Sequence, residues 1–475
     1  MAGNLPDYVA SAKAIPLGNR APWYKNIGPT YAAVMLWFVF WQALGTAGKH
    51  AGGTLANGLG TAVLGVLVAA LICHFLFYLV PGLLGMKTGL PLYVVGTSTY
   101  GVVGGLILPG FVMGVLQFGW IGVNAYGVAT LLCKCFGIPL AEGAIGFPII
   151  DPVHTAIVIV FACAVAFMGL KGIQYVARVA TFFPIIPIVV LLILTAVTIG
   201  GVADFSNEQL VSAAGAGPET SLGPIGIVVF FSTVIVGFFA TAGAAGTDIA
   251  MSSRHQQDVQ IGGLAGIALA TLVSGGLTVL IVAGAHGAGL VPADLPARNL
   301  NPLNPLDLMN GGLLNRRLAN IFMILLAISS FPGACFSAFI AANSFKTTMP
   351  KVNPYLSVGI GTIASIILAV TGLTGKVVEV FVVIGASFGP VCGAMAADYL
   401  LAGRKWAGPR AGFNPAGWIS WLAGFAVGAA DFVPAVQGRV PCSPVAAFVV
   451  GFSLYILLAK MGLQSRRLDM PVAPQ

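Results

Sequence analysis

The chain has 475 residues, of which 58% are apolar and only 8% are charged. Soluble globular proteins carry roughly 25% charged residues, so this composition excludes a soluble enzyme, a disordered chain and a disulfide scaffold. The formal net charge is +8, but the basic residues stand singly in loops between apolar runs. That placement is typical of topology signals in membrane proteins, so we expect a lipid bilayer and no nucleic acid as partner.

The apolar runs are long enough to cross a bilayer as helices. A spanning helix needs about 20 apolar residues, and these runs are continuously apolar, whereas the strands of an outer-membrane barrel alternate. We predict an all-α polytopic protein with one transmembrane domain at 28–462, a cytoplasmic N-terminal tail at 1–27 and a cytoplasmic C-terminal tail at 463–475. Twelve spans are expected near 28–47, 57–85, 101–133, 153–170, 176–201, 223–247, 261–289, 318–344, 354–371, 377–400, 415–434 and 443–462.

The distribution of basic residues predicts the orientation of these spans. With a cytoplasmic N-terminus, 15 of the 22 Lys and Arg residues fall on the cytoplasmic side, as the positive-inside rule requires. The seven on the outer side are Lys49, Lys134, Arg298, Arg316, Arg317, Lys376 and Arg439. Both termini are therefore expected in the cytoplasm, and the short tails favour a bacterial inner membrane.

Two segments rich in small residues fall in the first and sixth spans. They are 40–48 (FWQALGTAG) and 237–248 (GFFATAGAAGTD). Gly lowers helix propensity by about 1 kcal/mol relative to Ala, so each segment can unwind and offer backbone groups to a ligand or ion. The same residues are also compatible with unbroken helices that pack closely. Their matched positions favour a transporter built from two inverted five-span repeats, plus two extra spans.

Polar side chains inside the spans are few, and such residues often serve function. Gln117 and Trp120 lie three residues apart and share a helix face, which suits a planar heterocycle that hydrogen-bonds and stacks. A glutamine bonded to a neighbouring helix and a gap-filling tryptophan would give the same pattern. Ser329 and Ser330 can supply two hard oxygens to Na⁺, or can bond back to their own helix. Because no acidic residue lies centrally in a span, a neutral substrate is expected.

Three stretches of the chain resemble the nucleobase:cation symporter-1 family. They are GVLQFGWIGVNAYG in the third span, GFFATAGAAGTDIAMSSR in the sixth and GASFGPVCGAMAADYLLAGRKW in the tenth. The third-span stretch is most similar to cytosine permeases. The resemblance covers about 28–462 and implies a five-plus-five inverted-repeat fold, similar to that of LeuT, with twelve spans and broken helices one and six. It also implies import of a nucleobase or related heterocycle by symport with Na⁺, ahead of H⁺.

The resemblance also implies roles for individual residues. Trp120 would stack on the ligand ring, Gln117 would hydrogen-bond its edge, and Phe239 would stack from the other side, with Phe238 adjacent and Thr241 at a hydroxyl position. The hydroxyls of Ser329 and Ser330 and the carbonyl groups of Leu326, Trp37 and Phe40 would bind Na⁺.

The chain departs from the cytosine-type pattern just after the two serines. Those members carry an Asn there, whereas this chain has none between Ser330 and Asn343. A related pyrimidine, a purine or a hydantoin-like ring therefore stays open as the substrate. An amino-acid permease of the same fold is the alternative. No enzyme activity, no cofactor other than the coupling ion and no obligatory protein partner is expected.

Overall fold

A computed structural model describes residues 5–45, 50–140, 151–171, 183–213, 221–298 and 300–470. Within these ranges the regular structure is helical and no strand forms, so the predicted all-α class is confirmed. The helices of the first half are α1 (Asp7–Ala10), η1 (Leu17–Asn19), η2 (Trp23–Lys25), α2 (Ile27–Met35), α3 (Phe38–Gly45), η3 (Gly53–Leu55), α4 (Gly58–Ile72), η4 (Cys73–Tyr78), α5 (Leu79–Thr88), α6 (Leu92–Val95), α7 (Thr97–Gly105), η5 (Leu106–Val112), α8 (Met113–Phe136), α9 (Pro152–Lys171), α11 (Ile185–Thr198), η6 (Ile199–Asp204) and α12 (Asn207–Ala213).

The second half follows the same pattern of long helices joined by short turns. Its helices are α13 (Pro224–Ala244), α14 (Gly246–Ala250), α15 (Gln256–Gly263), η7 (Leu264–Leu269), α16 (Ala270–Gly287), η8 (Pro296–Arg298), α17 (Pro305–Leu308), η9 (Met309–Leu313), α18 (Arg316–Ser329), α19 (Phe331–Thr348), α20 (Pro354–Val370), η10 (Leu373–Gly375), α21 (Val377–Leu401), α22 (Pro415–Gly428), η11 (Ala430–Phe432) and α23 (Ser443–Lys460).

These helices make the chain a multi-pass membrane protein. Among the described residues, nine helices are long and apolar enough to cross a membrane, and the bent pair α2 and α3 brings the number to ten. Each of the twelve predicted spans coincides with a helical segment, but α20 and α22 are shorter than a full crossing. The number twelve therefore stays a prediction, and the start of the predicted fifth span lies outside the described residues.

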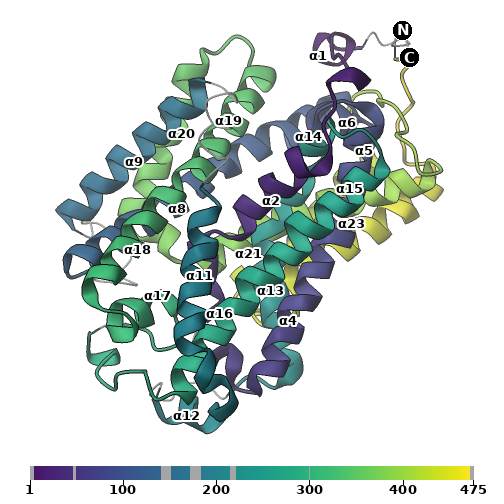
Figure 1. Cartoon of the computed structure of the whole chain (residues 1–475). Coiled ribbons are helices and arrows are strands. Elements are labelled where there is room, and N and C mark those ends of the chain that lie inside the picture. Colours follow the sequence, from purple (N-terminus) through teal and green to yellow (C-terminus); the bar gives the residue numbers. More distant parts are fainter. Residues whose placement is uncertain are drawn as a thin grey trace.

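The helices form two packed groups that lie side by side (Figure 1). In one group α13 packs against α4 and α21, and α21 packs against α22 and α23. In the other, α8 packs against α9, α19 and α20, around a separate apolar core that includes Ile121, Val165 and Ala338. The central cavity described below lies where α2, α8, α13 and the junction of α18 with α19 meet.

The first span is broken at a place that its glycines do not mark. α2 and α3 meet at a bend of 51° across Leu36 and Trp37, whereas the predicted break covered 40–48, of which residues 46–48 lie outside the described part. Residues 40–45 belong to α3. The break lies earlier because Trp37 and Phe40 both pack on Phe238, and tertiary packing overrides intrinsic propensity.

The sixth span breaks only at Ala245, between α13 and α14. Most of the segment predicted to unwind, 237–244, is helical. Its glycines allow close packing instead: a Cβ on Gly237 would lie 2.6 Å from the carbonyl oxygen of Phe381. The packing alternative therefore explains this glycine, while the interruption falls at the end of the predicted segment.

Both ends of the described chain lie on one face, which we call the terminal face (Figure 1). The Tyr8 hydroxyl donates to the carbonyl of Val102, and the Val102 N–H donates to the carbonyl of Arg410 at 2.8 Å. Arg410 in turn forms a β-bridge with Arg467. A buried ion pair between Arg410 and Asp398, at 2.9 Å, anchors this contact to α21. Both ends of the described chain thus share one face, and the location of that face in the cytoplasm stays a prediction.

Candidate substrate cavity

A cavity of about 290 Å³, the central cavity, opens where the broken helices meet. It follows α2 from Lys25 and Asn26, on the terminal face, to Trp37 at the bend. Its deep part is lined by aromatic and uncharged polar side chains, namely Trp37, Trp120, Phe238, Gln117, Asn124, Thr241, Ser329 and Ser330. Among the described residues of its lining, the one charged side chain is that of Lys25, at the mouth.

Trp120 holds the third and sixth spans together at the cavity wall. Its indole Nε1 donates a hydrogen bond to Thr241 Oγ1 at 3.1 Å, and its ring lies edge-on to Phe238 with centroids 5.3 Å apart. The α-helical spacing within α8 brings Gln117 to the same cavity. The predicted neighbours Gln117, Trp120, Phe238 and Thr241 thus line one cavity.

Two amide side chains of α8 retain hydrogen-bonding capacity toward the cavity. The Gln117 amide nitrogen contacts the Met113 sulfur at 3.4 Å, a weak acceptor, and no described residue bonds its amide oxygen. Asn124, which the sequence analysis did not single out, donates its side-chain N–H to the Trp120 carbonyl at 2.9 Å. Its position one turn after Trp120, on the same helix face, was the signal that could have identified it.

Trp37 lies at the bend of the first span and brings a second indole to the cavity. Its ring stacks on Phe238, with centroids 6.0 Å apart and planes inclined by 23°. Its Nε1 is buried and has no hydrogen-bond partner in the described part of the chain. Leaving a buried donor unsatisfied costs about 1–3 kcal/mol, so this N–H is suited to an acceptor on a ligand. The sequence analysis considered only the carbonyl group of this residue.

Phe239 and Phe40, two of the predicted site residues, do not line the central cavity. Phe239 is fully buried on another side of α13 and packs on Tyr31, with ring centroids 5.6 Å apart. Phe40 packs on the far side of Phe238, with centroids 4.9 Å apart. Successive residues of a helix point about 100° apart, because a turn takes 3.6 residues. Phe238, not Phe239, is therefore the ring that reaches the cavity.

Ser329 and Ser330 lie at the junction of α18 and α19 and both line the cavity. The Ser329 hydroxyl donates to the Leu326 carbonyl at 2.7 Å, and the Ser330 hydroxyl to the same carbonyl at 3.4 Å. Both serines therefore bond back to their own helix, one of the two alternatives left open by the sequence. A donating hydroxyl keeps lone pairs that can face a cation. Leu326 itself is fully buried and not part of the lining.

Comparison with known proteins gives matches at the level of structure. No protein-family model matches the chain, and no curated protein matches its sequence. The inward-facing conformation of Mhp1 is 15% identical, with a TM-score of 0.67 over 96% of each chain. Mhp1, a nucleobase-cation-symport-1 family transporter, in a closed conformation with bromovinylhydantoin bound, has a TM-score of 0.64 over 96% of this chain and 97% of that one.

A Na⁺-coupled sialic acid symporter is 13% identical, with a TM-score of 0.58 over 98% of this chain and 93% of that one. The chain has the LeuT-like transporter fold. It shares this architecture with a nucleobase-cation-symport-1 family transporter, as the resemblance of its third, sixth and tenth spans implied. Because the same fold also serves a sialic acid symporter, the substrate must be argued from the cavity.

In this transporter fold, five aromatic rings close the central cavity on the side away from the termini. This aromatic cluster consists of Trp37, Phe40, Trp120, Phe238 and Phe381. Beyond it lies a second cavity of about 340 Å³, the distal vestibule, lined by residues that include Val39, Gln42, Thr130, Lys134, Asp307, Lys376 and Glu379. A salt bridge of 2.7 Å joins Lys134 of α8 to Asp307 of α17 across this vestibule.

Proposed function

We propose that the chain is a secondary active transporter of the nucleobase:cation symporter-1 family. It imports a neutral nucleobase or related planar heterocycle together with a cation, Na⁺ ahead of H⁺. The observation that carries the proposal is the central cavity, whose deep part is lined by the rings of Trp37, Trp120 and Phe238 and by the amides of Gln117 and Asn124, with no charged side chain among the described residues there. A planar heterocycle satisfies both features, because its faces stack on rings and its edge exchanges hydrogen bonds with amides.

Each aromatic and amide group has a role in this proposal. The rings of Trp120 and Phe238 stand edge-on to each other, so a flat ligand can lie against one face and meet the edge of the other. Gln117 offers an amide oxygen and Trp37 offers its unpaired indole N–H. One acceptor and one donor from opposite walls would fix the ligand in its plane.

The coupling ion would bind beside this site. The Ser329 and Ser330 hydroxyls border the same cavity as Trp37, and the carbonyl groups of Leu326, Trp37 and Phe40 complete the proposed set of oxygen ligands. The Trp37 carbonyl at the bend accepts the Phe40 N–H at 3.1 Å, and a carbonyl oxygen has a second lone pair that can face a cation. Oxygen ligands of this kind suit a hard cation such as Na⁺.

The position of the openings supports alternating access. The central cavity reaches the terminal face at Lys25, while the aromatic cluster and the Lys134–Asp307 salt bridge close the distal side. This arrangement corresponds to the state open to the terminal face, which is the cytoplasmic face in the predicted orientation. Import would then end with release along α2.

Transport into proteoliposomes tests the proposal. Uptake of radiolabelled cytosine would be measured with and without an inward Na⁺ gradient, against unlabelled purines, pyrimidines and hydantoins as competitors. We expect stimulation by Na⁺ and one heterocycle that competes best; because no Asn follows the serine pair, another pyrimidine, a purine or a hydantoin is open as that heterocycle beside cytosine. Competition by amino acids alone would indicate an amino-acid permease instead. Lack of uptake and competition under both Na⁺ and H⁺ gradients would refute the proposal.

A further inference from the structure

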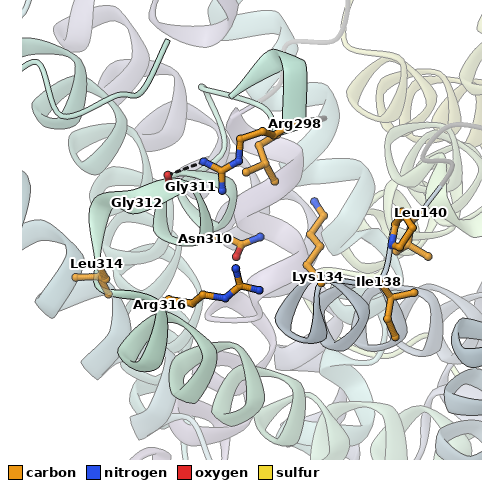
Figure 2. A pocket seen from close by; sticks show the side chains of 12 residues that line it. Lys134, Ile138, Leu140, Arg298, Asn310, Gly311, Gly312, Leu314 and Arg316 are labelled. Carbon is orange, nitrogen blue, oxygen red and sulfur yellow. Dashed lines mark hydrogen bonds between the residues drawn. The ribbon is translucent and has the colours of Figure 1, made fainter. Parts of the chain in front are cut away.

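A third cavity lies on the distal face, opposite the termini, and shares one described lining residue, Lys134, with the distal vestibule. This pocket, of about 420 Å³, is lined by residues of three segments: the end of α8, the connection from η8 to η9, and the start of α18. Three of its lining residues are basic, Lys134, Arg298 and Arg316, and we call it the arginine pocket. Their side chains and the amide of Asn310 point toward a common space (Figure 2).

The positive charge of the arginine pocket is only partly balanced. Lys134 forms its salt bridge with Asp307, which does not line the pocket. Arg298 donates to the carbonyl of Gly311 at 3.1 Å and lies 3.8 Å from Asp294, whose side chain is 64% exposed. Arg316 has no hydrogen-bond or ion-pair partner among the described residues, and its guanidinium lies beside Gly137. Among the described residues, the basic side chains of the lining therefore exceed their acidic partners.

The position of Arg316 adds to this excess. It is the first residue of α18, whose first turn contains Arg316 and Arg317 and no acidic residue. The amino end of a helix is itself positive, so cations are disfavoured there and anions are favoured. The Asn315 side chain accepts only the N–H of Leu318, which leaves other N–H groups of that turn available.

The predicted membrane topology makes this cluster of basic residues unusual. Of the seven basic residues predicted on the outer side, four are at or next to this pocket: Lys134, Arg298, Arg316 and Arg317. Basic residues are generally depleted on that side. Lys134 lies more than 160 residues before the three arginines in the chain, so folding brings it to them, and the local sequence around Arg298–Arg317 does not account for the whole cluster.

We propose that the arginine pocket binds an oxyanion of the phosphate class, either free in solution or as the headgroup of an anionic phospholipid. Guanidinium groups match the oxygens of such anions through paired N–H donors, and two of them line this space from different segments. Asn310 adds an amide donor and Lys134 a point charge. The apolar residues Ile138, Leu140 and Leu314 on the lining would accommodate the glycerol or acyl part of a lipid.

This site is independent of the substrate proposed for the central cavity. It borders the transport pathway through one residue, because Lys134 lines both the arginine pocket and the distal vestibule. An anion in the pocket would compete with Asp307 for Lys134, and occupancy would then weaken the salt bridge that closes the vestibule.

Binding of two probes to the purified full-length protein tests the proposal. In nanodiscs of phosphatidylcholine alone, equilibrium dialysis with radiolabelled inorganic phosphate would measure the free ion. In parallel, native mass spectrometry after reconstitution with phosphatidylglycerol would count retained anionic lipid. Arg316→Gln removes an exposed guanidinium of the lining, and Arg317→Gln is the matched control, since Arg317 is its exposed neighbour outside the lining. Arg298→Lys keeps the charge but not the paired donors.

We expect one bound probe per chain, with affinity reduced at least tenfold by Arg316→Gln, less by Arg298→Lys and under twofold by Arg317→Gln. Binding of phosphate without retention of lipid assigns the site to a free anion, and the reverse assigns it to a headgroup. If wild type binds neither probe, or if Arg316→Gln and Arg317→Gln lower binding equally, the proposal is wrong. Size-exclusion profiles confirm that each variant is folded.

Discussion

The central cavity and the distal vestibule have similar volumes, about 290 and 340 Å³, but opposite chemistry. Among the described residues, the central cavity has a single charged lining residue, Lys25, at its mouth, whereas the distal vestibule is lined by Lys134, Asp307, Lys376 and Glu379. Charged side chains are thus sparse in the central cavity, where a ligand would lose its water, and are concentrated in the distal vestibule, where the proposed entrance would have to close.

Physical chemistry explains this division. An ion that is buried without a matched partner loses several kcal/mol of hydration, whereas a neutral ring loses much less. A deep lining without charge therefore supports the neutral heterocycle proposed above over a charged metabolite. A salt bridge suits the closing function, because water that enters the vestibule weakens the attraction between its partners and lets them separate.

The largest expected effect is that of Trp120→Ala on the central cavity. The substitution removes a ring that packs on Phe238 and bonds Thr241, and truncating a buried interface Trp costs about 2–4 kcal/mol. Binding of the preferred heterocycle should fall about a hundredfold, as measured by scintillation proximity with the purified protein. Trp418→Ala, in α22 and outside the cavity lining, is the control. Near-normal binding by Trp120→Ala would remove this residue from the site.

The next effect concerns the coupling ion. Ser329→Ala combined with Ser330→Ala removes two oxygens from the cavity wall. A typical hydrogen-bonding contact contributes about 1 kcal/mol net, so the loss of two, about 2 kcal/mol together, should raise the Na⁺ concentration for half-maximal uptake roughly thirtyfold. Ser420→Ala deletes a serine that also bonds back to its own helix, in α22 away from the cavity, and should leave the Na⁺ requirement unchanged. If uptake does not depend on Na⁺ concentration in either the wild type or the variant, the proposed ion site is wrong.

The distal vestibule provides the third test. Lys134→Gln breaks the salt bridge with Asp307. Because the side chains of Lys134 and Asp307 are only 13% and 4% exposed, losing this pair should make the distal side open more often. Labelling of Val39→Cys in the vestibule wall by a membrane-impermeant maleimide should become about tenfold faster, in line with a change of about 1.4 kcal/mol. Lys376→Gln, which breaks the exposed pair with Glu379, should change the rate by less than twofold. Equal labelling rates in the two variants would show that the Lys134–Asp307 salt bridge does not keep the distal side closed.

The fold could be predicted from the sequence because composition and the length of apolar runs report directly on a membrane-spanning helical bundle. The exact breaks could not. Glycine propensity marked 40–48, but the bend lies at Leu36 and Trp37, where the packing of rings on Phe238 decides the geometry. Similarly, the choice between Phe238 and Phe239 depends on the rotation of α13, which no local pattern specifies.

The arginine pocket could not be predicted from the sequence for a related reason. Lys134, Arg298 and Arg316 are brought together only by the tertiary fold. Each one taken alone is a basic residue in a loop or at a helix end, as topology signals are. Their shared place on the side where such residues are depleted is the one signal in the sequence that could have drawn attention to them.

The smallest expected effect distinguishes an indole that serves a ligand from one that is merely buried. Trp37 and Trp418 both have an Nε1 that is buried without a hydrogen-bond partner among the described residues, but only Trp37 lines the central cavity. If the ligand accepts a hydrogen bond from Trp37, Trp37→Phe should weaken binding about fivefold, corresponding to about 1 kcal/mol for one hydrogen bond. Trp418→Phe should leave affinity unchanged, because its indole N–H faces no ligand.

Since phenylalanine at position 37 keeps an aromatic ring against Phe238, the loss of affinity reports on the N–H and not on stacking. Unchanged affinity in Trp37→Phe, measured with the heterocycle that competes best for uptake, would show that the ligand is held from the Gln117 side alone.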